Sequence, residues 1–411
     1  MSEDETMDGS LSAESIAAGS GAPGSDAKGR GGGDLGADDP GAGRIPSYWE
    51  YLRVEELLSL QGGVEGDEAQ LSDHEVLFVV VHQVYELWFK LVLRELSTAR
   101  DLMNQDPVPD QQLSGAAAAL RRVREILDHC ASHFRVMETL STRDFLDFRD
   151  KLLPASGFQS AQLREVEVLL GLEDDKRIHL GWEGSYMAAL KSHDGSPSPA
   201  YERVMKRRAD GISLREAVDG WLYRTPIRAS SPGDAGDAEV VRAFVDDFLA
   251  AQRDEIDITL GLAANQARGD QERAQLRERY EKGVAEARAF LLAEDVADAE
   301  QPRRARIRAA LLFIESYREL PLLAWPREVV DQIVALEQAF VIFRQRHARM
   351  VEREIGRRVG TGGSAGVDYL DETALRYRIF GDFWAVRTIL VRKEAVPKLA
   401  EGEFYGFRFG G

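Results

Sequence analysis

Histidine is the most informative residue type in this chain of 411 residues, because only seven occur and each can be checked against the spacing of known metal sites. No histidine has a glutamate three residues before it, so the Glu-x-x-His pairs of di-iron carboxylate proteins are missing. His129 and His133 have a zinc-like spacing of four residues, but neither an HExxH glutamate nor a third ligand accompanies them. We therefore interpret this pair as structural or exposed.

His82 lies in an aromatic stripe of a predicted helix. Phe78 stands four residues before it, Tyr85 three residues after it and Phe89 seven residues after it, so all share its side of the helix. Two interpretations fit this pattern. His82 is either a core histidine whose tautomer is fixed by one partner, or the single polar group of an apolar pocket.

His347 belongs to a second apolar stripe. The stripe consists of Ile333, Leu336, Phe340 and Phe343, reaches His347 and continues to Met350. One imidazole in an apolar slot suits the axial ligand of a haem, although a core histidine gives the same pattern. Because the chain has no Cys-x-x-Cys-His motif, any haem would be bound non-covalently.

Two further segments could contact a ligand. Arg149 lies among aromatic residues and could clamp a substrate carboxylate through two parallel hydrogen bonds, or pair with Asp147. The loop from Gly360 to Gly366 resembles a dinucleotide-binding fingerprint, but a helix precedes it and no βαβ pattern surrounds it. It also lacks a P-loop lysine, so either a tight turn or the close approach of backbone N–H groups to a ligand explains its glycines.

These residues must be positioned by helices, because apolar spacings of three and four residues dominate the sequence and alternating strand patterns are rare. We predict an all-α protein with one large domain of long helices over 45–411. Pro326 is expected at the first position of its helix, and the segment from Thr142 to Ser160 is expected to turn. The predicted helices are 68–103, 111–140, 162–172, 213–223, 240–293, 303–318, 326–356 and 368–392.

Two segments differ in composition from the rest of this domain. Residues 1–44 contain no aromatic side chain but hold 11 of the 37 glycines. They carry nine acidic and three basic residues. This composition predicts a disordered acidic tail. Residues 192–239 are rich in glycine, proline and serine and are interpreted as a loop-rich insert.

Charge and cysteine content exclude several classes of function. A net charge of −18 without a basic aromatic cluster argues against nucleic-acid binding. The single Cys130 cannot form an internal disulfide, a cysteine zinc site or an iron–sulfur cluster, which favours a reducing, cytoplasmic location. Apolar runs are too short for a membrane span, and the acidic N-terminus does not resemble a signal peptide.

Five blocks of the sequence together resemble the tryptophan 2,3-dioxygenase family. The resemblance extends from about Tyr48 to Leu399, excludes the N-terminal tail and is weak through 192–239. HQxYELWFK, here with valine at the variable position, and PASGFQS are its most specific motifs. The blocks are SYWEYL at 47–52, VHQVYELWFK at 81–90, FLDFR at 145–149 with PASGFQS at 154–160, the helix of His347, and the glycine loop at 360–366.

The resemblance implies an all-α homotetramer with one non-covalent b-type haem per subunit. Ferrous iron and O2 would cleave the indole C2–C3 bond of L-tryptophan to give N-formylkynurenine, a step of tryptophan catabolism in the kynurenine pathway. By motif position, His347 would be the axial iron ligand and His82 the distal group that accepts a hydrogen bond from the indole N–H. Arg149 would bind the substrate carboxylate, and Thr361 would help to hold the amino-acid head group.

The same resemblance assigns the walls of the site. Phe78, Phe145 and Leu152 would line the indole pocket, and Ser156 would lie near the haem edge. Tyr48 and Tyr51, which precede the first long helix, would close the site from a neighbouring subunit.

Two positions depart from the family pattern. Phe343 stands where the family commonly has tryptophan, and Ala365 replaces the second serine of TGGSSG. Both changes affect the surroundings of the presumed ligands, which concerns redox tuning and loop hydrogen bonding more than the fold. They leave two alternatives open: a biosynthetic haem monooxygenase acting on tryptophan or a substituted tryptophan, and a non-catalytic haem-binding helical sensor.

Overall fold

The computed structural model describes residues 46–152, 157–178, 186–192, 194–266, 269–358, 360 and 366–406. The chain divides into two compact units, the first ending at Leu57 and the second beginning at Leu58. The described part of the first unit contains α1 (Tyr48–Leu52) and α2 (Val54–Leu57). The tail 1–44, predicted to be disordered, lies outside the described residues.

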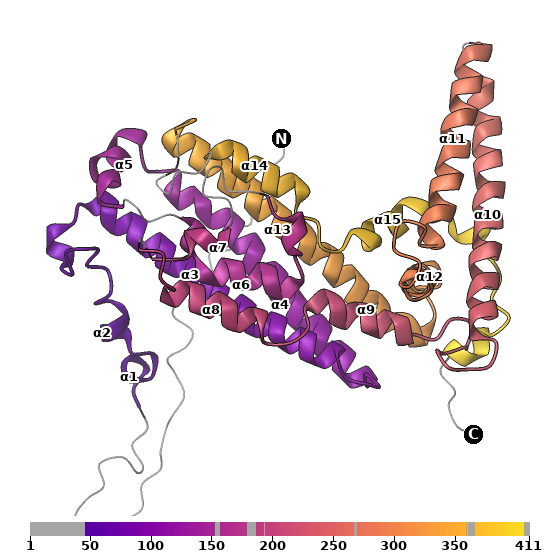
Figure 1. Ribbon diagram of the computed structural model, residues 1–411, viewed down its shortest axis with the longest axis horizontal. Helices are drawn as coiled ribbons and strands as arrows, with labels where there is room; N and C mark the ends of the chain where they lie inside the picture. Colours follow the sequence, from indigo (N-terminus) through magenta and orange to yellow (C-terminus); the bar gives the residue numbers. More distant parts are fainter. Residues whose placement is uncertain are drawn as a thin grey trace, which may run out of the picture. The chain divides into compact units, whose positions relative to one another are not determined.

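Three long helices form the centre of the second unit: α3 (Asp73–Met103), α4 (Asp110–Met137) and α13 (Ala324–Ile355) (Figure 1). Helix α4 packs against both of the others. Helix α3 begins where the side chain of Ser72 accepts a hydrogen bond from the backbone N–H of Glu75, a typical N-cap. The apolar stripes that the sequence predicted meet in this core, where Leu96, Leu120 and Leu336 are almost fully buried.

Shorter helices cover one side of α3. They are α5 (Thr142–Arg149), α6 (Ala161–Leu170), α8 (Pro199–Arg208) and α9 (Leu214–Arg224). Helices α5, α6 and α9 pack against α3, and α8 packs against α6. The segment 192–239 is therefore more helical than its composition predicted, because α8 was not expected there.

The C-terminal half adds α10 (Asp237–Gln266), α11 (Asp270–Leu291), α12 (Gln301–Ser316), α14 (Val367–Arg376) and α15 (Gly381–Ile389). Helices α10 and α11 lie side by side (Figure 1), and α12 packs against both. No strand occurs in the described ranges, where an isolated bridge pairs Ile227 with Ser230. The remaining short elements are η1 (Glu68–Gln70), η2 (Asp150–Leu152), η3 (Gly157–Gln159), η4 (Asp174–Lys176), α7 (Tyr186–Ala189), η6 (Pro321–Leu323), η7 (Lys393–Ala395) and η8 (Gly402–Tyr405).

The all-α prediction is confirmed, but several predicted boundaries are wrong. The helix predicted over 240–293 is two helices, and the segment expected to turn from Thr142 contains α5. The helix predicted over 368–392 is also interrupted. There the backbone N–H groups of Ile379 and Phe380 donate to the buried carboxylate of Glu337, so they are not available to a continuous helix. Helix α13 starts at Ala324, which places Pro326 at its third position.

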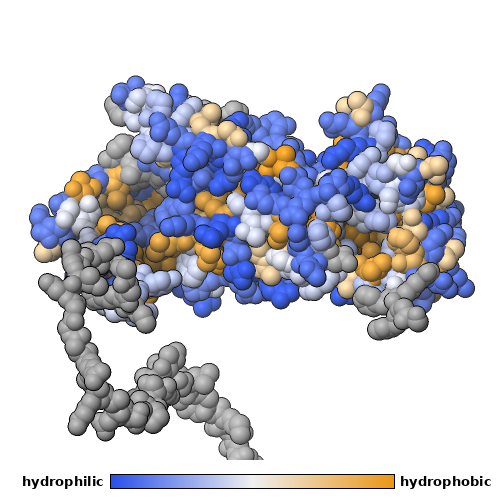
Figure 2. Space-filling model, turned by 90° about the horizontal axis from the view of Figure 1, so that it is seen from below, coloured by the Kyte–Doolittle hydropathy of each residue, from blue (hydrophilic) through white to orange (hydrophobic). Residues whose placement is uncertain are grey.

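Helix α3 is, among the described helices, the one that is long and apolar enough to cross a membrane. Part of its apolar character belongs to the protein core, because Val81, Tyr85 and Phe89 lie on a buried face of the helix. On the face shown in Figure 2, hydrophobic residues gather in the hollowed parts and hydrophilic residues cover most of the protruding surface. This distribution is typical of a globular core with local recesses.

Candidate active site

The backbone of α3 fixes the orientation of the His82 ring. The Nδ1 atom lies 2.8 Å from the carbonyl oxygen of Phe78, one helical turn earlier. Because a carbonyl oxygen can only accept, Nδ1 of a neutral ring must carry the hydrogen and donate it. The other nitrogen, Nε2, is then a hydrogen-bond acceptor, which is the form that a ligand N–H group requires.

His82 is uncharged at neutral pH. The surrounding protein desolvates the ring and lowers its pKa, although the Phe78 carbonyl and the negative charge of Glu86 act in the opposite direction. The side chain nevertheless keeps substantial accessible surface. An imidazole that is both desolvated and accessible is suited to meet a ligand in a recess.

The ring of Phe78 packs against His82 and belongs to a group of three phenylalanines. The Phe78 ring lies 4.0 Å from the His82 ring, between centroids, and 6.0 Å from that of Phe145. Phe148 completes the group at 5.5 Å from Phe78 and 5.4 Å from Phe145. The structure therefore brings the predicted wall residues Phe78 and Phe145 together. It adds Phe148, which sequence reasoning missed although it lies three residues after Phe145 on the same buried face of α5.

Arg149 is half-buried in the last turn of α5, and Leu152 in η2 packs against the main core. Between them, the ammonium group of Lys151 contacts the carboxylates of Glu75 at 2.9 Å and Glu65 at 2.7 Å. Glu75 is on the first turn of α3, so this ion pair attaches the end of α5 to the helix that carries His82.

His347 stacks on the ring of Phe134 at 5.4 Å and faces Phe343 at 6.4 Å. Desolvation, helped by nearby positive charge on Arg344 and Arg164, lowers the pKa of His347 to about 4. The imidazole is therefore neutral at pH 7, with a lone pair free to bind a metal ion.

A buried cluster of charges lies beside His347. The carboxylate of Glu167 is fully buried and contacts Arg177 at 2.6 Å, Arg344 at 2.7 Å and Arg164 at 3.1 Å. Burial alone would raise the pKa of Glu167, but the three guanidinium groups hold it at about 2. Arg177 also pairs with the exposed Asp174 at 3.4 Å, so Glu167 is the buried carboxylate shared by the three guanidinium groups.

These residues fit a haem. A neutral imidazole at His347, among aromatic rings, matches what haem iron and its macrocycle require of a protein. Within the described part of the chain, Nε of Arg164 and Nη2 of Arg177 are buried and have no hydrogen-bond partner. Buried cationic donors of this kind could hold the carboxylates of a haem. The arginine cluster was not predicted, because its members lie on α6, a loop and α13 and meet only in the fold.

Other predicted site residues belong to the first unit or lie outside the described residues. Tyr48 and Tyr51 are strongly exposed on α1, which belongs to the first unit. Thr361 and Ser156, like the substituted Ala365, lie outside the described residues. His129 and His133 stack on each other along α4 at 6.2 Å, and no group of three potential metal ligands occurs among the described residues.

An all-helical fold with a neutral imidazole at His347, aromatic rings beside it and buried arginines close by is compatible with the class of haem proteins. Comparison with known sequences gives the family. The family model described as tryptophan 2,3-dioxygenase matches residues 37–390. The chain belongs to the tryptophan 2,3-dioxygenase family, whose members depend on haem.

Individual relatives agree with this assignment. A tryptophan 2,3-dioxygenase of Sorangium cellulosum is 58% identical over 374 residues, covering 90% of each chain. A tryptophan 2,3-dioxygenase 2 of Ralstonia nicotianae is 53% identical over 88% of this chain and 97% of its own. A tryptophan 2,3-dioxygenase-like protein of Xanthomonas campestris is 54% identical over 65% of this chain and 98% of its own.

Proposed function

We propose that this protein is a haem-dependent dioxygenase that cleaves the indole C2–C3 bond of L-tryptophan with O2, giving N-formylkynurenine. The observation that carries the proposal is the state of His82. Its ring is neutral, its Nδ1–H is used by the Phe78 carbonyl, and its acceptor nitrogen is left for a ligand beside aromatic rings. A flat apolar ring with one N–H donor, which is an indole, complements this arrangement.

Each side chain then has a defined task. His82 accepts the indole N–H hydrogen bond through Nε2, while Phe78 and Phe145 contact the ring. Arg149 binds the α-carboxylate, and Thr361 holds the amino-acid head group. Leu152 narrows the apolar pocket. These contacts fix the indole in one orientation and exclude water from it.

The haem would be held by the imidazole of His347 and by the guanidinium groups of Arg164 and Arg177, with Ser156 close to it. A b-type haem in the ferrous state, when bound there, supplies the iron that activates O2. The protein's own contribution is to keep His347 neutral and its surroundings apolar. Phe343 packs in this region and has no N–H to donate, so it cannot hydrogen-bond as a tryptophan would.

We also propose a cytoplasmic homotetramer. One face of α3 carries an apolar stripe that is incompletely buried, with Leu87 51% exposed and Val80 39% exposed. Exposed apolar stripes of this kind are typical of interfaces between subunits. Tyr48 and Tyr51, each 76% exposed, would close the site of a neighbouring subunit. The stripe consists of Val76, Val80, Val84, Leu87 and Leu91.

The test is aerobic turnover of L-tryptophan under 18O2 by the haem-loaded, ascorbate-reduced protein. We expect a product two labelled oxygen atoms heavier than tryptophan. The matched control is His347→Ala, which should lose the Soret absorbance and the ferrous–CO spectrum along with turnover.

Other outcomes would contradict specific parts of the proposal. A gain of one labelled oxygen would identify a monooxygenase instead. Full haem spectra without loss of tryptophan would identify a haem sensor. An unchanged Soret band in His347→Ala would show that His347 is not the ligand.

A further inference from the structure

A cavity of about 560 Å³ lies between α10, α11 and the end of α15. Helices α10 and α11 lie side by side there (Figure 1), and the cavity is lined mainly by apolar side chains. Its volume is in the range of cavities that hold small molecules in proteins. None of its lining residues belongs to the candidate active site, so the proposed reaction does not account for it.

Missing side chains on α11 create this space. Leu276, Tyr280, Gly283, Ala287 and Phe290 line the cavity and follow one another at spacings of four, three, four and three residues, as in the seam between two packed helices. Gly283 leaves a gap in this seam, because a Cβ atom added to it would meet nothing within 4 Å. Glycine is also unfavourable in the interior of a helix, so the space is kept at a cost to the stability of α11.

Gln252 of α10 supplies an unsatisfied hydrogen-bond acceptor at the cavity. The side chain is 8% exposed, and its Nε2 donates to the backbone carbonyl of Ile389 at 3.1 Å. That bond sets the orientation of the amide, and its Oε1 is buried without a hydrogen-bond partner in the described part of the chain. Leaving a buried amide oxygen unpaired costs free energy, which a ligand with an N–H or O–H group would recover.

Arg279 supplies a positive charge on the same cavity. It is exposed, and no carboxylate of the described ranges lies within ion-pair distance of it. The acidic residue that lines the cavity, Glu286, pairs with Lys282 at 3.6 Å instead. Arg279 precedes Gly283 by one helical turn, which is about 6 Å along α11. Its guanidinium is therefore available to an anionic group of a ligand in the gap.

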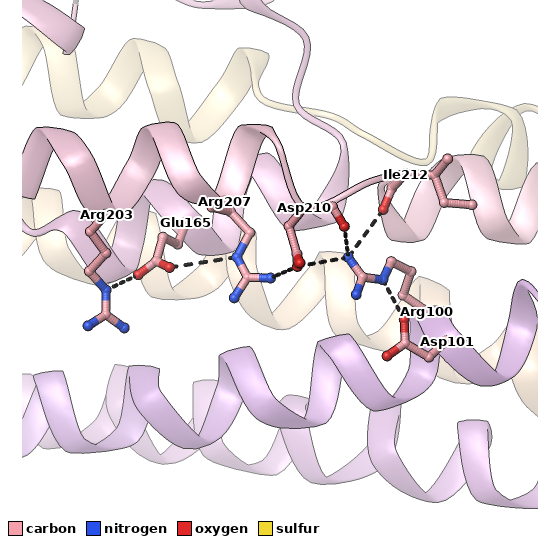
Figure 3. A network of polar contacts seen from close by, with 7 residues as sticks. All are labelled: Arg100, Asp101, Glu165, Arg203, Arg207, Asp210 and Ile212. Carbon is pink, nitrogen blue, oxygen red and sulfur yellow. Dashed lines mark hydrogen bonds and ion pairs between the residues drawn. The ribbon is translucent and has the colours of Figure 1, made fainter.

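A second cavity, of about 310 Å³, has no such unmatched charge. It is lined by four arginines, and Figure 3 shows two of them in a network of ion pairs. Arg100 contacts Asp101 at 2.8 Å and Asp210 at 3.3 Å. Arg207 contacts Asp210 at 2.5 Å and Glu165 at 3.6 Å. The other two arginines are also paired with acidic residues, so this network is explained by the packing of α3, α6 and α8.

We propose that the cavity between α10, α11 and α15 is a binding site for a small amphipathic organic anion. The apolar ring system of the ligand occupies the gap at Gly283. One N–H or O–H group of the ligand donates to Oε1 of Gln252, and its carboxylate or sulfonate pairs with Arg279. The site is separate from the proposed tryptophan site and does not depend on it.

The test uses anilinonaphthalene sulfonate, which combines an apolar ring system, one N–H group and one anionic group. Its N-methyl derivative lacks only the N–H group. Equilibrium dialysis of the full-length, haem-loaded protein measures the affinity for both probes. Wild type should bind the N–H probe about fivefold more tightly, as expected for one hydrogen bond. Gln252→Leu should remove this preference, and Arg279→Gln should weaken binding of both probes about threefold.

Gly283→Phe should weaken binding of both probes about tenfold or more, because the new ring fills the space that they need. Gly261→Phe is the matched control. Gly261 is also an exposed glycine inside a long helix, a Cβ atom added to it would meet nothing within 4 Å, and it does not line the cavity. This variant should bind both probes as wild type does, and all variants should keep the Soret band.

Unchanged probe binding in Gly283→Phe would overturn the proposal, and so would equal losses in Gly283→Phe and Gly261→Phe. Equal affinity of wild type for the two probes would overturn the role of Gln252. If Gly283→Phe does not fold, Arg279→Gln changes an exposed side chain and decides the matter, since unchanged binding of both probes would contradict the site. Failure of the proposed dioxygenase activity would leave all of these results as they are.

Discussion

Glu354 is an acid that the protein keeps uncharged. It lies seven residues after His347 on α13, is 5% exposed, and within the described part of the chain its Oε1 has no hydrogen-bond partner. Burial raises its pKa to about 8, and the neighbouring negative charge of Glu138 adds to the effect. At neutral pH the folded protein therefore holds a proton that the unfolded chain has released.

This difference predicts how stability depends on pH. Below about pH 4.5 the carboxyl is protonated in both the folded and the unfolded state, so it does not change the free energy of unfolding. From there to about pH 8 only the unfolded chain ionises, so the folded state loses stability, by roughly 3 kcal/mol at pH 7. Glu354→Gln cannot ionise, so its advantage over wild type should grow from pH 5 to pH 8. Urea unfolding at four pH values measures this slope, and a difference independent of pH would show that Glu354 is charged in the fold.

For single residues, the sequence was sufficient to predict site residues that follow a helical pattern. It was not sufficient for residues that come into contact from different helices. His82, Phe78 and His347 were found because each occupies an apolar helix face. Arg164 and Arg177 look like ordinary surface charges in the sequence. Their importance depends on Glu167 and α13, and no local pattern encodes that contact.

Among the elements, α6 and α13 are joined by the ion cluster around Glu167. Replacing this carboxylate removes the buried counter-charge that Arg164, Arg177 and Arg344 share, and only Arg177 keeps a second partner, the exposed Asp174. Glu167→Gln should therefore lower the free energy of unfolding by roughly 3–5 kcal/mol. Differential scanning calorimetry of the haem-free protein would measure the loss.

The matched control is Glu372→Gln, which removes an exposed ion pair with Arg376 on α14. Exposed pairs of this type contribute little, so its melting temperature should barely change. Similar losses in both variants would mean that the cluster at Glu167 is no more important than a surface pair.

The helix boundaries also show where apolar patterns in the sequence no longer predict the structure. Helices α3, α4 and α13 were predicted to within a few residues because their apolar stripes continue without interruption. The break between α14 and α15 was missed. Its cause is Glu337, a residue on a different helix whose carboxylate takes the N–H groups of Ile379 and Phe380.

For the whole molecule, the N-terminal region can be divided into two parts with different expected effects. A protein that begins at Ile45 should keep its haem content and its turnover, because residues 1–44 contain no aromatic side chain and few groups able to form a core. A protein that begins at Leu58 also lacks α1 and α2, and with them Tyr48 and Tyr51. Its turnover should fall while its haem spectrum remains.

Steady-state kinetics with light scattering on each truncated protein would check this prediction and report the oligomeric state. Loss of activity on removing 1–44 alone would contradict the boundary. Full activity without α1 and α2 would show that the two tyrosines do not close the site.

The hydrogen bond from His82 to the Phe78 carbonyl has a consequence for how the protein can vary. Its acceptor belongs to the main chain, so no substitution at position 78 removes the oxygen atom. A related sequence that keeps this turn of α3 therefore keeps the same tautomer of the His82 imidazole, whichever side chain it has at position 78. Diversification of the substrate pocket can therefore proceed without resetting the protonation of the histidine beside it.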